Sequence, residues 1–124
     1  MMQPTTRDEL RNLIDECIAK EGTDCDLNHI DISQVTDMSE LFSESYFNGD
    51  ISQWNVSNIE NMNKAFYHSK ITHNLDNWIV TKAQEKNDIF TDSILEKNGQ
   101  LPYWTNLSLD EIQHILEKEE YQKN

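Results

Sequence analysis

The 124-residue sequence is short of basic residues, and it contains no long apolar run. Ten Lys and Arg stand against 23 Asp and Glu, which gives a formal net charge of -13. Nucleic acids and anionic membranes are bound through basic surfaces, so this charge argues against both as direct partners. No segment approaches the roughly 18 consecutive apolar residues of a membrane-spanning helix, and the N-terminus lacks the basic start and apolar run of a signal peptide. We therefore expect no membrane span, no signal peptide and a cytoplasmic location.

Glycine, histidine and cysteine are too few and too scattered to build the familiar catalytic and metal-binding motifs. The three glycines are too far apart for a phosphate-binding loop, and no Gly-x-Ser-x-Gly is present. The four histidines show no paired zinc-ligand spacing. Asp24, Asp26 and Asn28 begin a calcium-loop pattern, but His29 stands where Gly is required and Val35 where the bidentate Glu is required. We expect no enzyme activity, no cofactor and no metal; a hydrolase whose site the sequence does not reveal is a third alternative.

The sequence has two cysteines, Cys17 and Cys25. Cys17 falls on the apolar side of a predicted helix, where a thiol acts as a small apolar residue. In a reducing compartment disulfides are rare, so we expect two structural thiols rather than a bridge.

The main feature of the sequence is a 24-residue repeat, which is clearest from Ile51 to Ser69. Shifting the sequence by 24 residues superimposes mostly apolar positions on one another. The clearest columns are Leu27, Ile51 and Leu75; Ile30, Trp54 and Trp78; Met38, Met62 and Lys86; and Phe42, Phe66 and Phe90. Such a period is typical of a solenoid, in which each unit buries its apolar face only by stacking on its neighbours.

Each unit predicts a strand followed by a helix. The apolar residues that open the unit alternate with polar ones, as in a short half-buried strand. Ser57 with Glu60, and Thr81 with Gln84, then match the capping box that begins a helix. The sequence therefore predicts an α/β solenoid of about three strand–helix units.

Amphipathic helices are predicted at both ends of the repeats. Thr6 with Glu9 forms a capping box before an apolar stripe that ends at Gly22, and Ser108 with Glu111 does the same near the C-terminus. We expect one domain, 1–124, with a capping helix over 6–22, repeats over 24–104 and a C-terminal helix over 107–122. Helices in these places would cover the exposed ends of the stack.

The run from Phe47 to Phe66, FNGDISQWNVSNIENMNKAF, resembles the repeat of the BspA-like leucine-rich-repeat family, which includes the mycoplasma-lipoprotein-type surface repeats. The resemblance covers roughly residues 24–95 and leaves both flanking helices outside it. It implies a right-handed leucine-rich-repeat-like solenoid with a parallel sheet on one side and no catalytic residues. Many members of the family are surface-exposed and are implicated in adhesion or other protein contacts; adhesion is not carried over to this chain.

On a strand of such a repeat, the residues between the buried positions project from the concave face. They form a mostly polar ladder, which is either a docking surface or simply a solvated face. Its candidate partner-binding residues are His29, Asp31, Gln53, Asn55, Asn77, Ile79 and Tyr103.

A second candidate surface is acidic. No Lys or Arg occurs between Lys20 and Lys64, and the carboxylates of that stretch would sum into a field that a basic partner could sense over the screening length of about 8 Å. The other interpretation is a solvated acidic face. The candidate patch comprises Asp24, Asp26, Asp37, Glu40, Glu44 and Asp50.

These features predict a non-enzymatic protein–protein interaction module that binds a protein partner through the surface of its repeats. The alternative is an acidic inhibitor of phage or mobile-element type, anti-CRISPR-like or a nucleic-acid mimic, that blocks a nucleic-acid-binding enzyme. The partner would be basic if the acidic patch is the binding surface. The sequence leaves open which surface binds and what the oligomeric state is.

Overall fold

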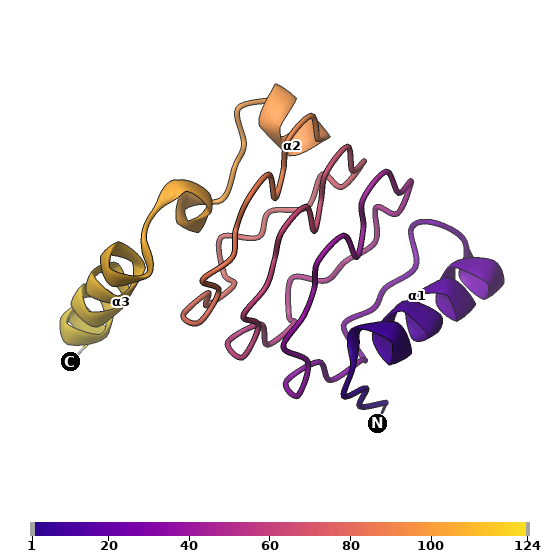
Figure 1. Ribbon diagram of the computed structural model, residues 1–124, viewed down its shortest axis with the longest axis horizontal. Coiled ribbons are helices and arrows are strands. Elements are labelled where there is room, and N and C mark those ends of the chain that lie inside the picture. The colour runs from indigo at the N-terminus through magenta and orange to yellow at the C-terminus, as the bar shows by residue number, and fades with distance from the viewer. Residues whose placement is uncertain (1, 124) are drawn as a thin grey trace.

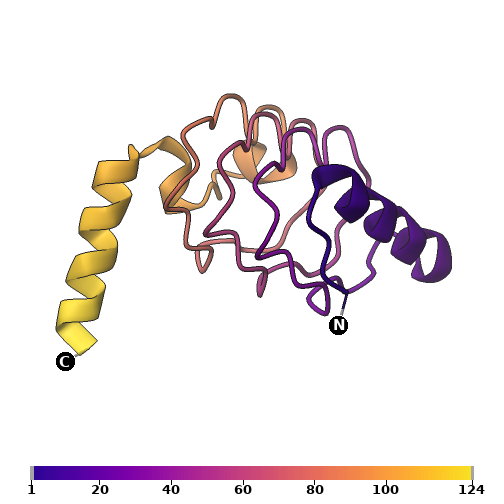
Figure 2. The same ribbon diagram turned by 60° about the horizontal axis from the view of Figure 1, so that its bottom comes forward.

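The computed structural model describes residues 2–123, and side chains are described for residues 2–119. It contains the helices α1 (Arg7–Glu21), α2 (Ile94–Lys97) and α3 (Leu109–Lys123), and one 3-10 turn, η1 (Tyr103–Asn106). Between α1 and α2 the chain winds through three stacked layers that follow the 24-residue columns. α1 lies at one end of the stack and α3 at the other (Figures 1 and 2).

The predicted α/β fold is wrong. Residues 2–123 contain no strand, and pairing between layers is limited to isolated parallel bridges from Asp37 to Asn61 and from Asn61 to Glu85. The helices predicted after Ser57 and Thr81 are also absent, and turns take their place. The parallel sheet, the strand–helix unit and the leucine-rich-repeat-like solenoid built from them are therefore overturned.

Turns replace strands and helices because Asp and Asn side chains hold the backbone at fixed places in each layer. Seven such side chains accept a hydrogen bond of 2.7–3.1 Å from the amide two residues further on: Asp26, Asp50 and Asn74; Asp31 and Asn55; Asp37 and Asn61. This bond closes a local turn and competes with regular structure. Asn55 also accepts from the Ser57 hydroxyl at 2.6 Å, which diverts Ser57 from the predicted capping box.

Two further columns place non-glycine residues in the left-handed region of backbone space. These residues have φ values between 54° and 59°: Glu40, Lys64 and Asp88, and Glu44, His68 and Asp92. In the first layer Leu41 donates its amide to the Met38 carbonyl at 3.2 Å, and Ser45 donates to Phe42 at 3.2 Å, so a tight turn surrounds each left-handed residue. A left-handed residue interrupts any helix or strand, so the two columns keep each layer in consecutive turns.

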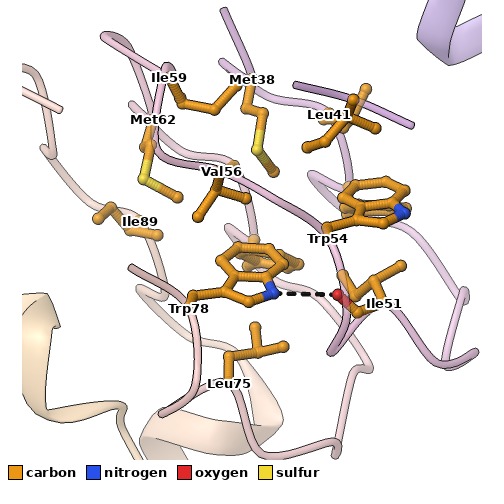
Figure 3. Packing of buried hydrophobic residues seen from close by; sticks show 14 of the residues in the cluster. Met38, Leu41, Ile51, Trp54, Val56, Ile59, Met62, Leu75, Trp78 and Ile89 are labelled. Carbon is orange, nitrogen blue, oxygen red and sulfur yellow. Dashed lines mark hydrogen bonds between the residues drawn. The ribbon is translucent and has the colours of Figure 1, made fainter. Parts of the chain in front are cut away.

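Aromatic columns bind the layers to one another. Phe42 stacks on Phe66 and Phe66 on Phe90, with ring centroids 5.4 and 5.0 Å apart. In the neighbouring column each indole N–H donates to a backbone carbonyl of the preceding layer: Trp54 to Leu27 at 2.8 Å, Trp78 to Ile51 at 3.0 Å and Trp104 to Leu75 at 3.0 Å. Figure 3 shows the bond from Trp78 to Ile51 within the apolar core. Each tryptophan thus fixes the register of its layer against the previous one.

α1 closes the N-terminal end of the stack and lies within the predicted range 6–22. Leu10 and Ile14 are buried against the first layer. The guanidinium groups of Arg7 and Arg11 donate to the carbonyls of Ser39 and Leu41, with 2.9 Å for the second bond. These carbonyls have no preceding layer to accept from, so the two arginines satisfy the polar groups of the exposed end.

η1 and α3 cover part of the C-terminal end of the stack, and α3 begins two residues later than predicted. Ser108 and Glu111 form the full capping box, with bonds of 3.0 and 3.1 Å. Lys86, which replaces the methionine of its column, donates to the carbonyls of Trp104 at 3.0 Å and Leu107 at 2.6 Å. Burial lowers the pKa of Lys86. No helix within residues 2–123 is long and apolar enough to cross a membrane.

Candidate functional site

Four residues of the predicted ladder lie together around a surface hollow of about 630 Å³. Gln53 and Asn55 come from the second layer, and Asn77 and Ile79 occupy the same columns of the third. The structure contains no concave sheet in its described part, so these side chains project from a surface of turns instead of strands. The repeat still places these side chains next to one another, because residues 24 positions apart lie above one another in successive layers.

A second hollow of about 480 Å³ lies on the other side of Ile79 and reaches the C-terminal helix. Asn77 and Ile79 border both hollows, and the second is also lined by Asp76, Trp78, Tyr103, Leu116 and Glu119. We call Gln53, Asn55, Asn77, Ile79 and Tyr103 the Ile79 face. Leu116 and Glu119 were missed by the sequence reasoning, and the only signal for Leu116 was its place in the apolar stripe of the predicted helix.

Ile79 is exposed at a position where the other layers use a polar side chain. The same column holds Asp31 and Asn55, whose oxygens accept from the amide two residues on. An isoleucine side chain cannot accept that hydrogen bond. Ile79 is also not buried as an apolar residue, since 51% of it is exposed. A single exposed isoleucine is common on protein surfaces, but this one lies between two hollows and beside the half-buried Tyr103 and Leu116. The arrangement is that of an apolar contact point with polar surroundings.

Negative charge borders the second hollow. The Asp76 carboxylate accepts from the backbone amide of Tyr103 at 3.0 Å. Burial raises the pKa of the Tyr103 phenol, and the charges of Glu119 and Asp76 raise it further. Tyr103 therefore stays neutral at physiological pH, and Asp76 and Glu119 leave an acidic rim beside the apolar centre.

His29 and Asp31 do not belong to this face in the structure. The N-terminal segment covers Asp31, whose amide donates to the Met2 carbonyl at 2.9 Å and whose carboxylate accepts from Gln3 at 2.9 Å. His29 borders a separate hollow of about 160 Å³ together with residues of α1. The predicted ladder is thus divided between the two ends of the stack.

A comparison with protein-family models matches residues 9–124 to the family described as "Mycoplasma protein of unknown function, DUF285". The chain belongs to this family. The match begins in α1 and includes all three layers and the Ile79 face. Searches of curated proteins and of solved structures gave no match.

In this DUF285 chain, the residues of the predicted acidic patch are dispersed and partly engaged in turns. Asp24, Glu40 and Glu44 are exposed, whereas the carboxylates of Asp26, Asp37 and Asp50 each accept a backbone amide. The amide of Ser52 lowers the pKa of Asp50.

The stretch from Lys20 to Lys64 contains no Lys or Arg between these two residues, but cations from other parts of the chain lie close to it in the structure. The amide of Glu40 donates to the Asn63 carbonyl at 3.0 Å, which places Glu40 beside Lys64 of the next layer. From the other side, α1 places Arg7 on the carbonyl of Ser39. These cationic neighbours are not visible in the sequence of this stretch, because they come from α1 and from one repeat further along the chain.

No group of three or more His, Cys, Asp or Glu side chains within the described part of the chain could hold a metal ion. Cys17 and Cys25 are free thiols, and Cys17 donates to the Glu21 carboxylate at 3.4 Å. Burial raises the pKa of Cys17 to about 12, and the hydrogen bond that it shares with Cys25 adds to the shift. Cys17 is therefore almost entirely the unreactive thiol at neutral pH.

Proposed function

We propose that this protein is a non-enzymatic interaction module that binds a protein partner through the Ile79 face. The observation that carries the proposal is the exposure of Ile79, at 51%, in a column whose other members are turn-forming Asp31 and Asn55. The two hollows of about 630 and 480 Å³ on either side of it offer room for a partner's side chains.

The chemistry of the face indicates what the partner presents. Ile79, Tyr103 and Leu116 offer an apolar centre, and aromatic and aliphatic anchors of this kind dominate the energy of protein interfaces. Asp76 and Glu119 at the rim favour a partner with Lys or Arg at its edge. The resemblance to BspA-like surface repeats also supports protein binding.

The test is capture of partners from a cell lysate by the full chain, with variants that separate the face from the rest of the surface. Ile79→Asp places a charge at the centre of the face, and Gln34→Asp adds the same charge at an exposed position in another column. We expect the variant at Ile79 to lose a partner that the wild type and the control both retain. A partner retained equally by all three proteins contradicts the proposal. Amide NMR spectra of the variants would verify that each is folded.

The net charge of -13 favours a second candidate, an acidic inhibitor that occupies the basic groove of a nucleic-acid-binding enzyme. Under this hypothesis the captured partner is released by moderate salt and displaced by added DNA or RNA. The double change Glu40→Lys and Glu44→Lys would abolish binding, and Ile79→Asp would not. Asp37 is a poorer target, because its carboxylate closes a turn.

A further inference from the structure

At one row of alternate residues, the hydrogen bonds between the layers run in one direction, whereas elsewhere some run back, as from the amide of Glu60 to the Thr36 carbonyl at 2.7 Å. In the first layer every second amide donates to a carbonyl of the second layer: Met38 to Asn61, Glu40 to Asn63, Phe42 to Ala65 and Glu44 to Tyr67, at 2.7–3.0 Å. The second layer repeats the pattern on the third: Met62 to Glu85, Lys64 to Asn87, Phe66 to Ile89 and His68 to Thr91, at 2.8–2.9 Å. Along this row the stack therefore displays carbonyls at its N-terminal end and amides at its C-terminal end.

The amides of the third layer are left open. The equivalent donors are Lys86, Asp88, Phe90 and Asp92, and the amide of Asp92 donates to the Glu96 carboxylate at 3.0 Å. No described residue accepts from the amides of Lys86, Asp88 and Phe90. We call these three the amide row. At the N-terminal end, by contrast, Arg7 and Arg11 occupy two of the matching carbonyls.

A second copy of this chain does not fit the amide row. Two copies placed with their amide rows together would face donors with donors, which cannot form hydrogen bonds. A head-to-tail copy would offer its carbonyl end, but there α1 covers the layer and Arg7 and Arg11 already donate to Ser39 and Leu41. The complement is a segment that adopts the turns of a further layer and offers a carbonyl at every second residue, comparable to the addition of a peptide to an exposed backbone edge.

The charges beside the row indicate the side chains of that segment. Along one left-handed column the charge alternates from Glu40 to Lys64 to Asp88. Along the other, the His68 imidazole lies 3.1 Å from the Asp92 carboxylate. A further layer that continued both columns would place cations beside Asp88 and Asp92, at positions four residues apart.

We propose that the amide row binds a basic segment of another protein, which adopts the turns of a further layer. Alternate carbonyls of the segment accept from Lys86, Asp88 and Phe90, and two of its cations, four residues apart, lie beside Asp88 and Asp92. This site belongs to residues 86–92 and is separate from the Ile79 face, so it does not depend on the function proposed above.

The probe is a synthetic peptide of residues 59–70 of this chain, IENMNKAFYHSK, acetylated and amidated at its ends. Within the stack this segment offers its carbonyls to the first layer and carries Lys64 and His68 at the two column positions. The measurement is amide NMR of the full chain labelled with nitrogen-15, at a pH near 6 where the peptide histidine is largely protonated.

In the free protein we expect Lys86, Asp88 and Phe90 to exchange amide hydrogen faster than Met62, Lys64 and Phe66. The peptide should shift the amide-row signals and slow their exchange by about tenfold or more at saturation. A control peptide with Lys64→Glu and His68→Glu should bind about tenfold more weakly, since it loses two surface charge pairs.

The matched chain variant is Asp88→Asn with Asp92→Asn, because Asn tolerates the left-handed conformation and removes only the charge. It should fold normally and weaken peptide binding by about tenfold. Full protection of the amide row in the free chain would overturn the proposal, because the row would then already be covered. The proposal would also be overturned if the peptide, at saturating concentration, shifted the amide signals of the Ile79 face instead of the amide row, or shifted no amide signal.

Discussion

Replacing Trp78 by phenylalanine tests whether the indole column holds the layers together. Trp78 is 1% exposed and stacks between Trp54 and Trp104, with ring centroids 6.4 and 6.1 Å away. Its N–H donates to the Ile51 carbonyl at 3.0 Å. Trp78→Phe keeps an aromatic ring but removes this hydrogen bond, which is worth about 1 kcal/mol. The substitution also removes part of both stacking contacts, and the smaller ring leaves a small cavity. We expect the free energy of unfolding to fall by about 3 kcal/mol.

The Ile51 carbonyl limits the loss, since it also accepts the backbone amide of Trp54 at 3.2 Å and is not left unpaired. The assay is urea unfolding followed by amide NMR, which does not depend on tryptophan fluorescence. Tyr46→Phe is the control, because Tyr46 is 74% exposed and its change should remain within about 0.5 kcal/mol. A loss below about 1 kcal/mol for Trp78→Phe would refute the role given to the indole column.

Four further substitutions, one of which is a control, test the turns and the end of the stack by the same unfolding assay. The pKa of Asp50 is lowered from 3.8, so its ionised carboxylate stabilises the fold above that pH. The wild type should therefore be more stable than Asp50→Asn at neutral pH, and this difference in the free energy of unfolding should disappear as pH falls below 3.8. A difference that stays constant with pH would contradict this. Gly49→Ala would place a Cβ 1.8 Å from a backbone oxygen and should destabilise by more than about 3 kcal/mol, whereas Gly99→Ala meets no atom within 4 Å and should lose only about 1 kcal/mol through its left-handed backbone. Arg11→Met removes the bond to the Leu41 carbonyl and should lose about 1 kcal/mol; unchanged stability would show that this carbonyl needs no partner.

The repeat and its flanking helices could be predicted, but the conformation within each unit could not. The column of Ile30, Trp54 and Trp78 was visible because a fixed spacing depends only on which residues meet between layers. The alternation of apolar residues around Trp54 and Val56 was interpreted as a strand, although a chain of tight turns can also bury alternate residues. The Asp and Asn columns are in the sequence as well, but the sequence does not show whether such a side chain closes a local turn or whether the capping box that follows it begins a helix.

The candidate site was predictable only where it follows the columns. Gln53, Asn55, Asn77 and Ile79 were found together because the repeat itself superimposes them. The contribution of Leu116 depends on the angle at which α3 leaves the stack, and no spacing in the sequence encodes that angle.

The two left-handed columns restrict which substitutions this surface accepts in evolution. Six positions share the conformation, and the residues found there are Glu, Lys, Asp and His, none of which branches at Cβ. Valine, isoleucine and threonine are strongly disfavoured at such backbone angles. The sign of the side-chain charge can therefore change freely at these six sites, whereas a side chain that branches at Cβ is not accepted. A homologue can acquire a different electrostatic preference along these columns by single substitutions without repacking its core.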